Sequence, residues 1–244
     1  MLPIDEPPLD ADLIRSRHAA LVARLSEAAE AAGRDQGEVR IVAITKGFGI
    51  GVLLAAREAG LARFGENRVQ EALPKVAAAL DAEWHLVGRL QSNKARQAAH
   101  AFSAIHSVDS LDLLRRIDRI SDEDSLAPRV MLQVNVTGET SKAGFELGWF
   151  EDELQKAGGL RSTVAGLAAA QVAGLMTIGP TGANSSEARG TFATLRRLRD
   201  ELEQQLGRRL PELSMGMTAD AEAAVAEGAT LVRVGTAIFG PRPG

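Results

Sequence analysis

The chain contains neither cysteine nor tyrosine among its 244 residues. The first absence excludes disulfides, thiolate-bound zinc, iron–sulfur clusters and a cysteine nucleophile. The second excludes a tyrosine acting as acid, base or nucleophile. Basic residues are not in excess either, since 28 Lys and Arg stand against 32 Asp and Glu, for a net charge of −4. Because a broad nucleic-acid footprint needs positive charge, the sequence predicts no nucleic-acid partner.

Long apolar runs are also missing. No stretch reaches the roughly 20 apolar residues of a membrane span. The acidic, proline-bearing start MLPIDEPPLD lacks the basic flank and apolar core of a secretory signal. We therefore expect a cytoplasmic protein without a membrane partner. With 45% hydrophobic and 25% charged residues, the chain has the composition of a globular protein with a large core.

Short apolar runs alternate with helical segments along most of the chain. Residues 1–9 are expected to form a flexible tail, followed by a leading helix over 10–32 that stops at Gly33. Its apolar residues recur at helical spacing: Leu13, Ile14, Leu21, Val22 and Leu25. Eight strands are predicted at 39–45, 62–65, 84–88, 104–108, 129–136, 171–178, 213–215 and 231–235. Helices are predicted between them at 51–59, 69–80, 93–101, 111–120, 149–157, 186–206 and 220–227.

This alternation predicts the fold class. Strands joined through helices must run parallel. Eight such units in about 210 residues favour a single α/β domain over residues 10–244, a closed (β/α)8 TIM barrel with an extra N-terminal helix. An open doubly wound sheet is the alternative, but its first turn usually carries GxGxxG, whereas this chain has TKGFGIG. No shift in composition marks a boundary between domains.

In such a barrel the chemistry lies where strands end and helices begin, and two basic residues there stand out. Lys46 ends the apolar strand VRIVAIT. Partial removal from water there favours the neutral, nucleophilic amine that a Schiff base requires, although the side chain could instead extend to the surface. Arg233 lies in TLVRVGTAIF, where a buried guanidinium needs a partner. That partner is either a bound ligand or a structural carboxylate such as Glu66 or Asp220.

Two turns after the last two strands suit an anion. Gly235 permits close approach of the backbone, and Thr236 presents an N–H and a hydroxyl where the next helix starts. Ser214 and Thr218 lie in a similar turn, LSMGMTAD, although Thr218 could instead cap the following helix. Because the last two strands usually carry the phosphate site of this fold, the two turns together predict phosphate binding.

The chain has four histidines, at His18, His85, His100 and His106. They lack metal-ligand spacing, so no metal site is predicted. His85 lies within a strand, EWHLVG, where a hydrogen-bonded core histidine and a catalytic one are equally consistent with the pattern.

Several segments, in order, resemble the pyridoxal 5′-phosphate homeostasis protein family. These proteins are the proline-synthetase co-transcribed homologues, and they are similar to the N-terminal domain of alanine racemase. The one departure we note is Gly49, where the family usually has a proline, and it concerns the path of the loop rather than the lysine. The match extends from about Val39 to Arg242, and its segments are VAITKGFG, RFGENRVQEALPK, WHLVGRLQSNKAR, IHSVDS, QVNVTGETSKAGF, GLMTIGP and LSMGMTADAEAAVAEGATLVRVGTAIFGPR.

The resemblance implies a single barrel like the alanine racemase N-terminal domain, with pyridoxal 5′-phosphate (PLP) held as an internal aldimine on Lys46. It implies further that Arg233 faces the pyridine nitrogen and that Asn67 and His85 line the ring pocket. Lys142, in TSKAGF, would lie near the mouth of the site. The residues implied for the phosphate are Ser214, Gly235 and Thr236, with help from the backbone of Met217.

The residues limit the implied chemistry. A guanidinium donates hydrogen bonds and keeps its proton, so Arg233 pairs only with an unprotonated ring nitrogen, which makes the ring a weak electron sink. Racemisation needs an acid or base on both faces of the substrate adduct, and in alanine racemase one of them is a tyrosine, which this chain lacks. We therefore expect a PLP carrier with little or no turnover, acting in intracellular PLP (vitamin B6) homeostasis.

Two alternatives stay open. The first is a weak PLP-dependent amino-acid racemase, and the second is a barrel that binds another phosphate ligand without a Schiff base. For the carrier, the resemblance implies PLP and amino acids as small-molecule partners and transient contact with apo-PLP enzymes. We expect a monomer, because no long apolar surface stripe demands a dimer.

Overall fold

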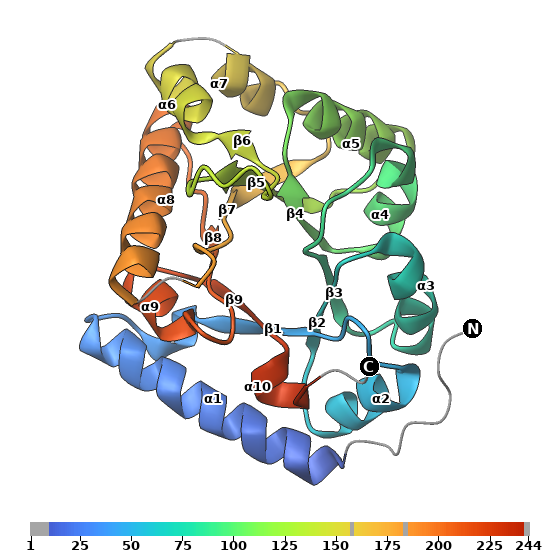
Figure 1. The fold of residues 1–244 in the computed structure, drawn as a ribbon. Helices are drawn as coiled ribbons and strands as arrows, with labels where there is room; N and C mark the ends of the chain where they lie inside the picture. The colour runs from blue at the N-terminus through green and yellow to red at the C-terminus, as the bar shows by residue number, and fades with distance from the viewer. Residues whose placement is uncertain (1–9, 157–158, 183–184, 242–244) are drawn as a thin grey trace.

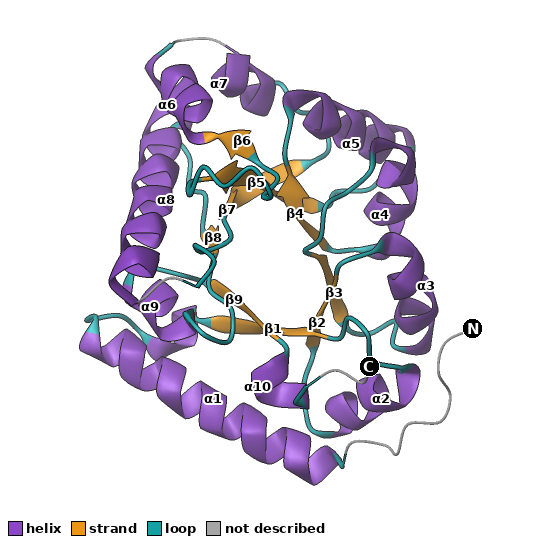
Figure 2. Ribbon diagram, in the orientation of Figure 1, coloured by secondary structure: helices purple, strands orange, loops and turns teal. Residues whose placement is uncertain are grey.

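The structure is a computed structural model that describes residues 10–156, 159–182 and 185–241. Eight parallel strands follow one another around a ring in the order β1-β2-β3-β4-β5-β7-β8-β9. The ring is closed, because β4 pairs with β5 and β9 pairs with β1, and helices surround it (Figures 1 and 2). The predicted (β/α)8 barrel is confirmed, whereas the predicted tail over residues 1–9 lies outside the described residues.

The bounds of the elements follow the predicted alternation. The barrel strands are β1 (Arg40–Ile44), β2 (Arg63–Glu66), β3 (Glu83–Leu86), β4 (Ala104–Val108), β5 (Arg129–Asn135), β7 (Gln171–Met176), β8 (Glu212–Ser214) and β9 (Leu231–Val234). The helices are α1 (Ala11–Ala31), α2 (Ile50–Glu58), α3 (Val69–Ala78), α4 (Ala95–Ala101), α5 (Leu111–Glu123), α6 (Leu147–Gln155), α7 (Gly159–Ala165), α8 (Ser185–Leu206), α9 (Ala221–Ala226) and α10 (Thr236–Phe239). Short 3-10 turns, η1 (Gln36–Glu38) and η2 (Ser92–Lys94), precede β1 and α4.

Three elements were not predicted: α7, α10 and a short strand, β6 (Phe145–Glu146), which pairs with β5 in a separate ladder. Each is too short to give a clear periodic signal. The helix predicted at 149–157 begins earlier, at Leu147, and ends at Gln155. The last residue of that prediction, Ala157, lies outside the described residues.

The leading helix, α1, packs along α2, α9 and α10 on the outside of the barrel (Figure 1). Leu13 and Val22, which the periodicity had placed on the packed face, are 43% and 41% exposed. The packed face is therefore narrower than predicted, as expected for one stripe of a helix against a convex surface. Its buried residues are Ile14, Leu21, Leu25 and Ala29.

The interior of the barrel is filled by side chains two residues apart on each strand, because alternate side chains of a strand point inward. On β1 this face carries Val42 and Ile44, and Lys46 follows two residues later in the turn after the strand. Gly65 on β2 leaves room for Ile44, since a Cβ at that position would lie 2.5 Å from Ile44 Cδ1. The aliphatic layer across the interior consists of Val42, Ala104, Met131, Met176 and Leu231, with Ile44 and Ile178 packed against it.

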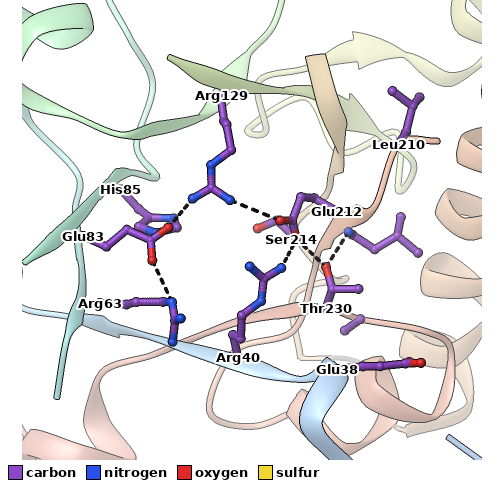
Figure 3. A network of polar contacts seen from close by, with 12 residues as sticks. Glu38, Arg40, Arg63, Glu83, His85, Arg129, Leu210, Glu212, Ser214 and Thr230 are labelled. Carbon is purple, nitrogen blue, oxygen red and sulfur yellow. Dashed lines mark hydrogen bonds and ion pairs between the residues drawn. The ribbon is translucent and has the colours of Figure 1, made fainter. Parts of the chain in front are cut away.

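A network of charges closes the base of the barrel, where the strands begin. Its members are the first residues of β1, β2, β3, β5 and β8. Glu83 pairs with Arg63 (2.8 Å) and with Arg129, while Glu212 pairs with Arg40 and with Arg129 (3.4 Å) (Figure 3). Every charge of this base network therefore has a partner of opposite sign.

Candidate functional site

A cavity of about 280 Å³ opens at the mouth of the barrel, where β1, β8 and β9 end. Four predicted site residues line it together: Met217, Arg233, Gly235 and Thr236. Their convergence follows from the fold, because the carboxyl ends of neighbouring parallel strands meet at one edge. The remaining lining residues are Ile44, Phe48, Thr218, Ala219 and Gly240.

Arg233 brings a positive charge to the wall of this cavity while remaining only 5% exposed. Its Nη1 donates to Ser214 Oγ (2.7 Å) and its Nη2 donates to the carbonyl of Thr177 (2.9 Å). Burial lowers the pKa of Arg233 to about 10, against a smaller opposing effect of the Asp220 charge. Within the described ranges no carboxylate forms an ion pair with it, so Arg233 is a buried cation held only by neutral acceptors.

The two structural carboxylates considered as partners of Arg233 are engaged elsewhere. Glu66 pairs with Lys75 at 2.6 Å, and Asp220 Oδ1 accepts a hydrogen bond from the N–H of Met217 at 2.6 Å. Because burying a charge without a counter-charge is costly, this favours the other alternative, in which the partner of Arg233 is a ligand in the cavity.

The shape of the turn after β8, whose residues line the cavity, depends on one glycine. Gly216 has φ +90°, and a Cβ there would lie 2.6 Å from Ala224 Cβ, so both conformation and packing require glycine. Asp220, not Thr218, occupies the N-cap position of α9. Thr218 is therefore not the cap, and its place is in the wall of the cavity.

Lys46 follows β1 in the turn at the carboxyl end of that strand and is half-buried. It lies in a turn in which the Phe48 N–H donates to the Thr45 carbonyl (3.0 Å) and Gly47 has φ +81°. In the described part of the chain, no hydrogen bond or ion pair occupies its amine. Gly49 has φ −79°, a value that proline also adopts, so the backbone conformation at this position is one that the proline of the family pattern could share.

A buried polar cluster that the sequence analysis missed holds the residue before Lys46. Lys75 of α3 is 1% exposed and donates to the Thr45 carbonyl (2.7 Å) and to Glu66 Oε1 (2.6 Å). The Thr45 hydroxyl donates to the same carboxylate oxygen (2.6 Å). The carbonyl and the hydroxyl of Thr45 are thus both held by hydrogen bonds, and these bonds fix the start of the turn that carries Lys46. A lysine on the packed face of an otherwise apolar helix was the signal available in the sequence.

The other lysines help to single out Lys46. The chain has five, and three of them form ion pairs: Lys75 with Glu66, Lys142 with Glu139 and Lys156 with Asp152. Lys94 lies in η2, outside the strands. Among the described residues, Lys46 is therefore the lysine that combines a position at the carboxyl end of a barrel strand with an amine that is not ion-paired.

A second, larger cavity of about 650 Å³ lies at the same end of the barrel, over β2 to β5. Asn67 and Lys142 line it, so both lie at the mouth. The Lys142 amine contacts Glu139, the carbonyl of Gly179 (2.7 Å) and the Thr137 hydroxyl (3.4 Å). It thereby ties the loop after β5 to the loop after β7.

The structure places His85 and Ser214 inside the barrel, beneath the cavity. His85 Nδ1 lies 2.7 Å from His106 Nε2, and His106 Nδ1 lies 2.7 Å from Ser214 Oγ. All three side chains are fully buried. Sequence reasoning missed His106. A signal was available, because His106 lies two residues after the buried Ala104 on β4 and therefore shares its face of the strand.

Fold and site together define a barrel with a cavity at the ends of the first and last strands, and a buried arginine lines that cavity. Lys46 is not among the residues that line it and follows the first strand in the adjoining turn. The sequence matches the alanine racemase N-terminal domain family over residues 17–243. A pyridoxal phosphate homeostasis protein from Synechocystis sp. is 41% identical over 207 residues, covering 84% of this chain and 92% of the relative. Another from Pseudomonas aeruginosa is 42% identical over 226 residues, covering 92% and 94%.

Among solved structures, PipY of Synechococcus elongatus with PLP bound superimposes with a TM-score of 0.80 at 40% identity, covering 93% of this chain and 100% of PipY. The chain belongs to the alanine racemase N-terminal domain family and, within it, to the pyridoxal phosphate homeostasis proteins. The resemblance predicted from the sequence motifs is thereby confirmed. In the described ranges no helix is both long and apolar enough to cross a membrane.

Proposed function

We propose that this protein binds PLP reversibly and acts in PLP homeostasis, with the ligand held as a Schiff base on Lys46. The observation that carries the proposal is the buried Arg233 guanidinium at the cavity wall, without an ion-pair partner among the described residues. PLP supplies a ring nitrogen that accepts a hydrogen bond and a phosphate that carries negative charge. PipY, which is 40% identical, has a structure with PLP bound, and this supports the same ligand here.

Each residue has a proposed role. Lys46 holds the aldehyde, Arg233 donates to the ring nitrogen, and Asn67 borders the ring from the larger cavity. Gly235 and Thr236 contact the phosphate, with the Met217 turn beside them. Met217 directs its N–H to Asp220, so the turn contributes mainly by its shape. Ser214 and His85 support the site from below, because both are buried inside the barrel.

We further propose that turnover is slight or absent. When bound, PLP supplies an aldehyde that condenses with amines and a ring that withdraws electrons. Arg233 keeps the ring nitrogen unprotonated, because a guanidinium offers only hydrogen-bond donors, and this weakens electron withdrawal. The chain also has no tyrosine to act as the second acid or base of a racemase.

Trapping the bound ligand tests this proposal. Protein incubated with PLP and reduced with borohydride should carry one adduct, on the peptide that contains Lys46, and Lys46→Ala should abolish it. Lys94→Ala is the matched control, because Lys94 also lacks an ion-pair partner among the described residues but lies in η2. An adduct that persists in Lys46→Ala, or no adduct in the wild-type protein, would contradict the proposal.

A second measurement separates a carrier from a weak racemase. The PLP-loaded protein is incubated with L-alanine in heavy water, and deuterium at the α-carbon is followed by NMR. We expect no exchange above the Lys46→Ala background. Exchange that depends on Lys46 would show that the protein is an enzyme.

Three further predictions concern the surroundings of the protein: a cytoplasmic location, a monomeric state and transient contact with apo-PLP enzymes. The apo-enzyme contact follows from the proposed carrier role, since a carrier must release PLP to proteins that use it. Sedimentation at several concentrations tests the monomer, and transfer of PLP to an apo-enzyme in the presence of a PLP trap tests direct contact.

A further inference from the structure

A line of buried polar side chains crosses the interior of the barrel from the mouth to the base. Arg233 Nη1 donates to Ser214 Oγ (2.7 Å), and that oxygen lies 2.7 Å from His106 Nδ1. His106 Nε2 lies 2.7 Å from His85 Nδ1. His85 Nε2 lies 3.2 Å from Glu83 Oε1, without the alignment of a regular hydrogen bond. The line therefore links the cavity to the base network.

The charge at the base decides which atoms in this line carry protons. Contact with His85, together with the charges of Arg129 and Arg63, lowers the pKa of Glu83 to about 2 against the effect of burial. Glu83 is therefore a carboxylate, which only accepts hydrogen bonds. An unprotonated ring nitrogen facing it would repel it, so His85 carries its proton on Nε2. Nδ1 of the neutral ring is then an acceptor.

The same reasoning passes along the line to the mouth. His106 must donate from Nε2 to His85, which leaves His106 Nδ1 as an acceptor. Ser214 must then give its single hydroxyl proton to His106 and receive the proton of Arg233 on a lone pair. Burial lowers the pKa of both rings, and the pKa of His106 falls further because positive charge on His85, Arg233 or Arg129 would repel its protonated form. Both rings therefore stay neutral, as this pattern requires.

We propose that Ser214, His106, His85 and Glu83 form a relay of fixed polarity that positions Arg233, with every hydrogen-bond donor directed from the mouth toward the base. The inference rests on the proposed function, since it gives His106 and His85 a role toward the ligand that Arg233 meets. His106 is then a positioning residue. Ser214 has no proton left for a phosphate, so its hydroxyl serves the site through Arg233.

The ring tautomers test the polarity directly, and in the ligand-free protein. The chain has only four histidines, so ¹⁵N spectra of the imidazoles can be assigned with one substitution for each ring. We expect His85 and His106 to carry the proton on Nε2 and to stay neutral from about pH 5 to 8, where exposed histidines titrate. A proton on Nδ1 of either ring, or a doubly protonated ring, would overturn the relay.

Two substitutions at one position test its effect on the ligand. In His106→Asn, the side-chain oxygen can take the place of Nδ1 and accept the Ser214 proton, whereas His106→Leu offers no acceptor. We expect His106→Leu to weaken PLP retention about tenfold, which corresponds to about 1.4 kcal/mol, and His106→Asn to stay close to wild type. Urea unfolding of both variants is measured alongside.

The pair of variants separates positioning from general stability. Equal PLP retention in His106→Leu and His106→Asn would overturn the positioning role. So would losses of PLP retention that only follow the unfolding free energies of the two variants. If wild-type protein and both variants all fail to bind PLP, the proposed function fails instead. In that case the ¹⁵N tautomers still decide the polarity of the line, because they are measured without ligand.

Discussion

The arginines at the two ends of the barrel meet opposite kinds of partner. At the base, Arg40, Arg63 and Arg129 each meet a carboxylate of Glu83 or Glu212 (Figure 3). At the mouth, Arg233 meets only a hydroxyl and a carbonyl oxygen. The base arginines are therefore ion-paired within the fold, whereas Arg233 forms no ion pair among the described residues. The same residue type serves the fold at one end and, in the proposed function, binding at the other.

The largest expected effect is at the base. Glu212 is 3% exposed and pairs with Arg40 and Arg129, so Glu212→Gln leaves two partly buried guanidinium groups with less counter-charge. Breaking a buried pair by removing one partner costs about 3–5 kcal/mol, and we expect a loss near the lower end in urea unfolding. Glu201→Gln, which removes an exposed partner of Arg197, is the control and should change stability by less than about 1 kcal/mol. Similar losses of unfolding free energy in the two variants would show that the base network adds little to the stability of the fold.

The next effect is at the mouth, and it depends on ligand. A ligand that binds only the folded state adds about 2.7 kcal/mol to the free energy of unfolding at a concentration 100 times its Kd. We expect PLP to raise the melting temperature accordingly, and pyridoxal, which lacks the phosphate, to raise it less. Equal shifts from the two compounds would argue against a phosphate site at the ends of β8 and β9.

Arg233→Met then sharpens the contrast between the ends. Because the substitution removes a buried cation that has no ion-pair partner among the described residues, we expect the ligand-free protein to be as stable as wild type or more stable. The binding free energy of PLP should become weaker by about 1.5–3 kcal/mol, which is the range for one hydrogen bond to a charged group. Equilibrium dialysis and urea unfolding measure the two quantities. A ligand-free loss as large as that of Glu212→Gln would make Arg233 a structural residue.

The smallest expected effect is a change in the free energy of unfolding at acidic pH. The pKa of Glu83 falls from 4.5 to about 2 on folding, so its stabilising contribution is complete above pH 4.5 and is lost as the pH falls toward 2. Wild type and Glu83→Gln should therefore differ most in unfolding free energy near neutral pH and converge in acid. We expect a smaller difference than for Glu212, because the Glu83 side chain is 26% exposed against 4%. A difference that is constant with pH would contradict the assignment.

Much of this arrangement could be predicted from the sequence. The apolar runs located all eight barrel strands, and the strand ends located Lys46 and Arg233 at one mouth. The pattern could not decide whether the partner of Arg233 is a ligand or a structural carboxylate such as Glu66 or Asp220, because that depends on which side of a strand or turn each carboxylate occupies. In the structure Glu66 faces α3 and Lys75.

The relay and the base network could not be predicted from the sequence, for a related reason. Arg40, Arg63 and Glu83 each begin a strand, where charged residues ordinarily meet solvent, and only barrel closure turns them toward one another. His85 and His106 lie 21 residues apart in the sequence, on neighbouring strands. Their contact depends on strand register, which the apolar pattern of two short strands does not specify.

The base network has a consequence beyond stability, because three guanidinium groups face two carboxylates and leave one positive charge in excess. The aliphatic layer above it, from Val42 to Leu231, is a poor dielectric and screens that excess weakly. We therefore expect a positive potential inside the barrel above the base, although the whole chain carries a net charge of −4. Such a potential would attract anions toward the open end, and we expect added salt to slow their capture.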